Sequence, residues 1–213
     1  MVADVLIANG ADLTAKDRTG ATLLHTASQL GLLSVVNKLI EKGAEINAKT
    51  NPTQAPSGRG GGGFRRGPSG EQTALMLAAR GNHLEVMRSL VKAGADPKLK
   101  AQDGSTLVMA AAASGHVEVV QYAYELNPDV KSVTNTKSTA MHAAISSLQV
   151  ASPPEMCKVI QFLADKGADL DALDANGRTP VSIADLIPID AVVDLLGKLI
   201  TASGAEPHIK SKR

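Results

Sequence analysis

The amino-acid sequence predicts an all-α protein, a solenoid of repeated helical units, and three observations point to this fold class. First, a motif of Thr followed by apolar residues recurs; it begins at Thr22, Thr73, Thr106, Thr139 and Thr179. Second, a closing motif follows it, as in KGAEINA from Lys42 and KGADLDA from Lys166. Third, aromatic residues make up only 2% of the chain, which suits thin layers of small helices better than one thick core.

The spacing of these motifs gives a base period of 33 residues. The five Thr positions lie 51, 33, 33 and 40 residues apart. The distance from Thr to the closing Gly or its equivalent is 21 residues in the first three units, 28 in the fourth and 25 in the fifth. The 18 extra residues before Thr73 therefore lie between two repeats, whereas the seven and four extra residues lie inside the fourth and fifth units.

Helix signals stand at regular places within a unit. Thr22 precedes an apolar run and is a natural N-cap residue. The later part of a unit, such as LLSVVNKLI from Leu32, repeats apolar residues three and four apart, as an amphipathic helix requires. Left-handed residues are expected to end the first helices at Gly31, Asn82 and Gly115, and the second helices at Gly43, Gly94 and Gly167. At the end of the third unit, Asn127 is expected to supply the turn and Pro128 to stop the helix.

The segment DRTGATLLHTASQLGLLSVVNKLIEKGAEINAK, residues 17–49, resembles one nearly complete ankyrin repeat. The resemblance to the ankyrin-repeat family covers the chain except for residues 50–67 and the last few residues. It implies two antiparallel helices per repeat with a hairpin loop between repeats, and hence one elongated curved domain. The family also pairs the Thr and His of its first motif by a hydrogen bond, and Thr22–His25 and Thr139–His142 match that pair.

The domain organisation follows from the period. We predict one ankyrin-repeat domain over residues 1–207, with a half repeat at 1–16, full repeats at 17–49, 68–100 and 101–133, a repeat with a seven-residue insertion at 134–173, and a closing repeat at 174–207. Residues 50–67 form a flexible Gly/Arg-rich insertion, and residues 208–213 form a basic tail. Because residues 1–16 hold only the second half of a repeat, we expect a fragment or shortened gene product; alternatively, their apolar residues cap the stack.

The insertion inside the fourth unit, around residues 147–156, lengthens the turn between its two helices. Pro153 and Pro154 are expected to act as a break before the next helix. Cys157 follows them at the start of an amphipathic helix, and we interpret it as a half-buried structural thiol because no acid–base partner is placed beside it.

Catalytic motifs are absent from the sequence. There is no GxSxG elbow, P-loop, dinucleotide-binding glycine motif or HExxH helix. The motif histidines His25 and His142 are replaced by Met76, Met109 or Ser182 in other units, which favours a structural role for them. We therefore predict no enzymatic activity, no cofactor and no metal site.

The composition excludes further classes. The net charge of +1 gives no overall attraction to nucleic acid or membranes. No apolar run is long enough to span a membrane, and the N-terminus lacks a signal peptide. We expect a soluble protein, with the cytoplasm favoured, that is a monomer or part of a longer chain.

The Gly/Arg-rich insertion has two interpretations. Arg59, Arg65 and Arg66 surround Phe64 among glycines, a composition that suits contact with RNA or single-stranded DNA. Only one such cluster occurs, so a tolerated loop insertion is the favoured interpretation.

The resemblance implies a protein partner that meets the hairpin tips and the exposed side of the first helices. The matching positions are Arg18, Thr19, Gln29, Leu30, Gln72, Arg80, Gln102, Asp103, Ser105, Asn135, Thr136, Ser138, Asn176 and Arg178. Because interface hot spots favour Arg, we expect Arg18, Arg80 and Arg178 to be the anchors. The predicted function is a non-catalytic scaffold for protein binding; the alternatives are a regulatory or targeting fragment of a larger enzyme and a nucleic-acid contact through the insertion.

Overall fold

A computed structural model describes residues 12–53, 70–147, 151–186 and 190–203. These residues form two compact units, one within residues 1–103 and the other within residues 104–213. In the described ranges every regular element is a helix, and the only β-type pairing among them is an isolated antiparallel bridge between Lys49 and Thr73.

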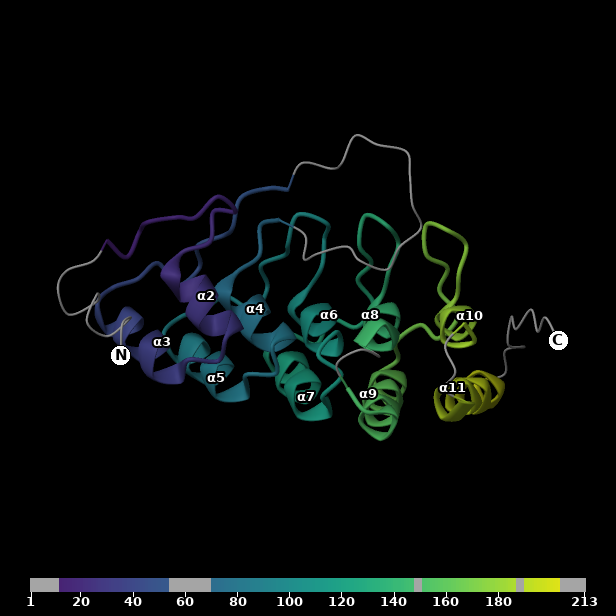
Figure 1. Cartoon of the computed structure of the whole chain (residues 1–213). Coiled ribbons are helices and arrows are strands. Elements are labelled where there is room, and N and C mark those ends of the chain that lie inside the picture. Colours follow the sequence, from purple (N-terminus) through teal and green to yellow (C-terminus); the bar gives the residue numbers. More distant parts are fainter. Residues whose placement is uncertain (1–11, 54–69, 148–150, 187–189, 204–213) are drawn as a thin grey trace. The chain divides into compact units, whose positions relative to one another are not determined.

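The first unit contains two helix pairs. They are α2 (Leu23–Gln29) with α3 (Leu33–Glu41), and α4 (Ala74–Arg80) with α5 (Leu84–Lys92). The first helices α2 and α4 pack side by side, and so do the second helices α3 and α5 (Figure 1). The buried core between these two rows includes Leu24, Leu39, Leu75, Met87 and Leu90.

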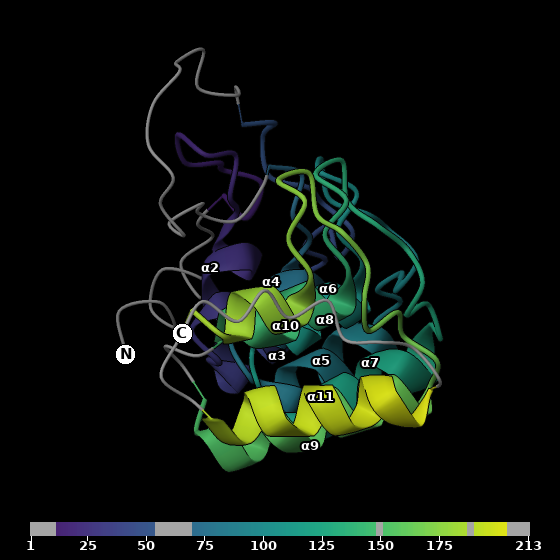
Figure 2. The same cartoon turned by 90° about the vertical axis from the view of Figure 1, so that its right-hand side faces the viewer.

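The second unit contains three helix pairs. They are α6 (Leu107–Ala112) with α7 (Val117–Leu126), α8 (Ala140–Ser146) with α9 (Pro153–Asp165), and α10 (Pro180–Ala184) with α11 (Asp190–Ala202). Figure 2 looks along this unit from its C-terminal pair, with α10 above α11. Its core includes Leu107, Met141, Ile145, Met156, Ile160 and Leu163.

The Thr of each first motif begins a helix, as the sequence predicts. Thr22, Thr73, Thr106, Thr139 and Thr179 are the N-cap residues of α2, α4, α6, α8 and α10. In α4, for example, the Thr73 hydroxyl accepts a hydrogen bond from the Met76 N–H over 3.3 Å. Such a cap satisfies a backbone donor that the helix itself leaves open.

The predicted left-handed turns are confirmed between the two helices of a repeat. Gly31 has φ +70°, and Asn82, which replaces Gly in the next repeat, has φ +61°. A Cβ atom on Gly31 would collide with the His83 imidazole of that next repeat. Gly31 is therefore required both by the backbone conformation and by the close approach of a neighbouring side chain.

Two expectations about proline-containing turns are wrong. Pro153 and Pro154 do not break the chain before a helix; they are the first residues of α9, behind the N-cap Ser152. The first turn of a helix needs no N–H donors, so proline is favoured there. Asn127 does not supply a left-handed turn, because its φ of −153° and ψ of 100° are extended. Pro128 excludes helical conformations from the residue before it, and this ends α7.

Candidate functional site

The hairpin before α2 is stabilised by one carboxylate. Asp17 Oδ1 accepts hydrogen bonds from the Thr19 N–H and hydroxyl, each over 2.7 Å, and from the Ala21 N–H over 2.9 Å. These hydrogen bonds from Thr19 and Ala21 lower the pKa of Asp17. The carboxylate is thus directed into its own turn, and the following Arg18 side chain stays exposed on the outside.

A recess lies beside this hairpin in the first unit, between the hairpins and the first helices. Its volume is about 610 Å³, and it is lined by Arg18, Thr19, Ala21, Gln29, Thr50, Asn51, Pro52, Thr53, Gly70, Gln72 and Leu77. Backbone bonds join its walls: the Asn51 N–H donates to the Thr19 carbonyl over 2.8 Å, and the Thr50 N–H donates to the Gln72 carbonyl over 3.0 Å. Four of the predicted contact residues, Arg18, Thr19, Gln29 and Gln72, therefore line one recess.

The two predicted glutamines on the neighbouring hairpins do not both face solvent. Gln72 is only 2% exposed, because its hairpin strand packs between repeats and its carbonyl accepts a hydrogen bond from His25 Nε2 over 3.1 Å. Gln102 is exposed, but its amide grips the backbone of Thr53: the Thr53 N–H donates to Oε1 over 2.7 Å, and Nε2 donates to the Thr53 carbonyl over 3.0 Å. The prediction that Gln72 lies on the surface is therefore wrong. The Gln102 side chain holds the backbone of Thr53 in place.

The three arginines predicted as anchors lie in different environments. Arg18 is exposed and makes no ion pair with any described residue. Arg80 is half-buried; burial lowers its pKa, the charge of Asp103 opposes this, and its Nε has no hydrogen-bond partner within the described ranges. Arg178 is bound to Asp174, with its NH2 nitrogen 2.7 Å from Oδ2. Of the three, Arg18 is the one whose side chain is exposed, whereas Arg80 and Arg178 are half-buried.

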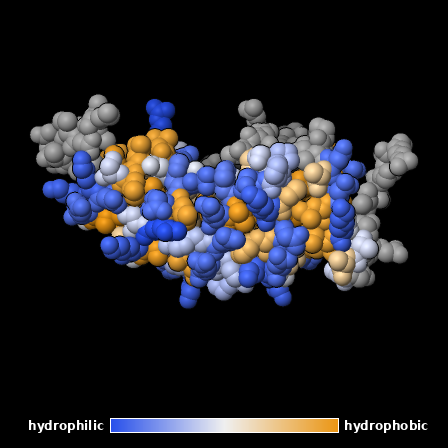
Figure 3. Space-filling model, turned by 90° about the horizontal axis from the view of Figure 1, so that it is seen from below, coloured by the Kyte–Doolittle hydropathy of each residue, from blue (hydrophilic) through white to orange (hydrophobic). Residues whose placement is uncertain are grey.

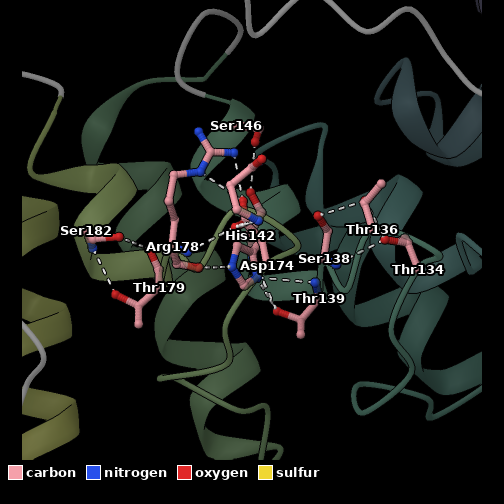
Figure 4. A network of polar contacts seen from close by, with 11 residues as sticks. Thr134, Thr136, Ser138, Thr139, His142, Ser146, Asp174, Arg178, Thr179 and Ser182 are labelled. Carbon is pink, nitrogen blue, oxygen red and sulfur yellow. Dashed lines mark hydrogen bonds and ion pairs between the residues drawn. The ribbon is translucent and has the colours of Figure 1, made fainter. Parts of the chain in front are cut away.

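Asp174 is buried and organises the hairpin before α10 (Figure 4). Burial alone would raise its pKa, but hydrogen bonds from the Arg178 guanidinium and from the N–H groups of Arg178 and Asn176 lower the pKa to about 2. The Arg178 carbonyl in turn accepts a hydrogen bond from His142 Nε2 over 3.1 Å. Arg178 therefore holds the closing repeat to the one before it.

The remaining predicted contact residues are distributed over hairpin tips and one helix end. Leu30, Asn135 and Asn176 are exposed, whereas Asp103, Ser105, Thr136 and Ser138 are half-buried. At the tip before α8, the Ser138 N–H donates to Thr134 Oγ1 over 3.0 Å, and the Thr134 and Thr136 hydroxyls lie 3.0 Å apart. At this tip a hydroxyl group accepts the kind of backbone hydrogen bond that the Asp17 carboxylate accepts in the first hairpin.

The motif histidines are structural in their geometry. His25 Nδ1 accepts a hydrogen bond from the Thr22 N–H over 3.2 Å and lies 2.9 Å from the Thr22 hydroxyl. Its Nε2 lies 3.0 Å from the Ala48 carbonyl, which only accepts, so Nε2 carries the proton. His142 repeats the contact, with Nδ1 2.9 Å from the Thr139 hydroxyl. Burial lowers the pKa of both imidazoles, which favours their neutral forms.

A second surface, which the sequence analysis did not single out, lies on the second helices of the second unit. Figure 3 shows one face of the chain, on which apolar residues are exposed among hydrophilic ones. A groove of about 530 Å³ is lined by Val117, Gln121, Cys157, Lys158, Gln161, Phe162, Asp165 and Leu195. The Tyr124 and Phe162 rings meet edge-to-face at 5.7 Å, and Lys166 Nζ lies 5.3 Å from the Tyr124 ring centre. Aromatic residues widely spaced in the sequence gave no signal of this cluster.

Neither a metal site nor a membrane span is found in the described part of the chain. No group of three or more His, Cys, Asp or Glu residues there could hold a metal ion. No helix among the described residues is long and apolar enough to cross a membrane. Cys157 is half-buried, as expected, and burial raises the pKa of its thiol. The proposed nucleic-acid contacts Arg59, Phe64, Arg65 and Arg66 lie outside the described residues.

Comparison with known proteins agrees with this geometry. A family model of ankyrin repeats in three copies matches residues 75–174, and a model of a single ankyrin repeat matches residues 19–51. The chain belongs to the ankyrin-repeat family. Ankyrin repeats are generally protein-interaction modules, and the family is generally non-catalytic.

A similar protein is the ankyrin repeat and KH domain-containing protein mask-1 of Caenorhabditis elegans. It is 31% identical over 104 residues, which is 49% of this ankyrin-repeat chain. The matched segment covers only 3% of the relative's length. The similarity therefore concerns the repeats and leaves the rest of that protein without a counterpart in the alignment.

Proposed function

We propose that this ankyrin-repeat chain binds a protein partner through its hairpin tips and the exposed side of its first helices. The observation that carries the proposal is the recess of about 610 Å³ in the first unit. Its volume is within the range of about 300–1,000 Å³ that is typical of small-molecule pockets, so it is large enough to receive side chains of a partner. Arg18, Thr19 and Gln29 line it and are exposed, so a partner can reach them.

The side-chain chemistry of the recess supports recognition rather than catalysis. Its described lining combines hydroxyl and amide groups with one guanidinium, and none of the described lining residues carries a carboxylate, imidazole or thiol. A nucleophile with a neighbouring base is therefore missing from this lining. Polar groups arranged beside a few apolar ones, such as Leu77 and Pro52, suit an extended polar contact with another chain.

Affinity capture with three versions of the full chain tests the proposal. The first is the unchanged chain, the second carries Arg18→Ala and Gln29→Ala in the recess, and the third carries Glu41→Ala and Arg88→Ala. All four positions are exposed, and the third version removes an Arg from the second helices instead of the first hairpin. We expect proteins bound by the unchanged chain to be retained by the Glu41/Arg88 version and depleted about tenfold by the Arg18/Gln29 version.

Quantitative mass spectrometry of the captured proteins provides the measurement, and circular dichroism confirms that the variants are folded. Equal recovery with all three versions would show that the first-unit recess is not the binding surface. Depletion of the captured proteins only with the Glu41/Arg88 version would show that the partner binds to the second helices.

A further inference from the structure

We infer that the recess in the first unit recognises an acidic peptide segment, with a side-chain carboxylate of the partner bound by Arg18. This inference rests on the proposed function and names the chemistry of the partner. It follows from the charge of the recess, from the exposure of Arg18 without an ion pair to any described residue, and from the neutral polar groups that line the same recess.

The described lining of the recess carries a positive charge. Among the described residues that line it, Arg18 is the one ionised side chain, and none is Asp or Glu. A single unopposed cation in a recess of neutral walls attracts a carboxylate and repels a basic segment. The lining thus selects for acidic partners and against basic ones.

The carboxylate nearest to Arg18 in the sequence does not neutralise it. Asp17 is occupied by three hydrogen bonds from its own turn, from the Thr19 N–H, the Thr19 hydroxyl and the Ala21 N–H. In the closing repeat the hairpin carboxylate does bind an arginine. Asp174 accepts hydrogen bonds from the guanidinium of Arg178, which stands four residues later. The first repeat has Ala21 at that later position, so no arginine competes for Asp17 and no described carboxylate holds Arg18.

Neutral polar side chains line the same recess as Arg18. Gln29, at the end of α2, and Asn51, on the adjoining hairpin, are both exposed and line the same recess as Arg18. Each carries an amide that donates and accepts, as does every peptide group of an extended segment. A guanidinium binds a carboxylate through two parallel N–H bonds, which adds a geometric preference to the charge. An acidic residue within an extended segment satisfies both requirements.

Peptide selection on the full chain tests the inference. Short random peptides, displayed with a free N-terminus and a fused C-terminus, are selected against the unchanged chain, Arg18→Glu and Arg88→Glu. Fusion removes the terminal carboxylate, so a selected acid must be a side chain. We expect the unchanged chain and Arg88→Glu to enrich Asp or Glu at one position, and Arg18→Glu to enrich Lys or Arg there.

The affinity of one selected peptide, measured by fluorescence anisotropy, adds a quantitative check. Replacing its acidic residue by the matching amide should weaken binding to the unchanged chain about tenfold, and should leave binding to Arg18→Ala almost unchanged. Selected peptides that bind at the recess but are not acidic would overturn the inference and leave the proposed function intact. Peptides that bind the Arg18/Gln29 double variant as well as the unchanged chain, or no enrichment at all, would contradict both.

Discussion

His25 and His142 illustrate how single residues make the repeats sensitive to acid. Both are buried with lowered pKa values, so the folded chain keeps them neutral below the ordinary pKa of 6.5. Below about pH 6.5 the unfolded chain binds more protons than the folded one, and the free energy of unfolding falls as the pH decreases. We expect urea unfolding midpoints to decline between about pH 6.5 and 5, and a His25→Gln/His142→Gln variant to show a flatter profile. An unchanged slope in that variant would refute this origin.

Asp174 and Arg178 act in a lower pH range. The Asp174 pKa of about 2 lies below the ordinary 3.8, so its stabilising contribution is present above about pH 3.8 and is lost as the pH falls towards 2. We expect Arg178→Ala to lower the free energy of unfolding by about 1–2 kcal/mol, because it leaves a buried carboxylate with fewer donors. The same variant should keep its affinity for the partner, in contrast to Arg18→Ala. Calorimetry measures both the free energy of unfolding and the affinity for the partner. It thus decides whether Arg178 binds the partner or stabilises the fold.

At the scale of the hairpins, two residues other than glycine, Glu71 and Lys137, have the unfavourable positive φ. Lys137 has φ +56° at the turn position where other hairpins have Gly20, Gly104 and Gly177. Because a side chain is strained there, Lys137→Gly should raise the free energy of unfolding by about 1 kcal/mol. The control Lys131→Gly, at an exposed residue without positive φ, should lower it or leave it unchanged. Denaturant titration measures the free energy of unfolding of both variants. An equal change in the two variants would show that Lys137→Gly relieves no strain.

The helical elements themselves were predictable from local signals. Thr before an apolar run and Gly at a left-handed position are requirements of a single chain segment, so Thr22 and Gly31 could be placed without knowing the neighbours. The two errors came from proline, whose effect depends on position: Pro153 starts a helix, whereas Pro128 forces Asn127 out of one. The family pattern alone did not decide between these outcomes.

The candidate site was predictable only in outline. The sequence predicts Arg18 and Gln29 on one surface, and both line the recess. The burial of Gln72 and the hydrogen bonds between Gln102 and Thr53 depend on contacts between repeats. The pair of Arg178 with Asp174 is different, because its residues lie only four apart in one hairpin, whereas the exposure of Arg18 is seen only in the structure. Pairings across about 33 residues or more are set by packing, and a repeat motif does not report them.

For the whole molecule, we propose that the partner binds to one of two surfaces of the first unit. The hairpins and the first helices α2 and α4 form one surface, and the second helices α3 and α5 form another. We propose that the partner binds to the surface of the hairpins and of α2 and α4, in contact with Arg18. Variants at Glu41 and Arg88 on the second helices should therefore fold and bind as the unchanged chain does.

Hydrogen–deuterium exchange of the full chain, with and without its purified partner, shows which of the two surfaces the partner covers. We expect slower exchange on binding in peptides that cover residues 17–30 and 50–53, with residues 33–42 and 84–93 unchanged. Slower exchange confined to residues 33–42 and 84–93 would contradict this expectation and would assign binding to the second helices.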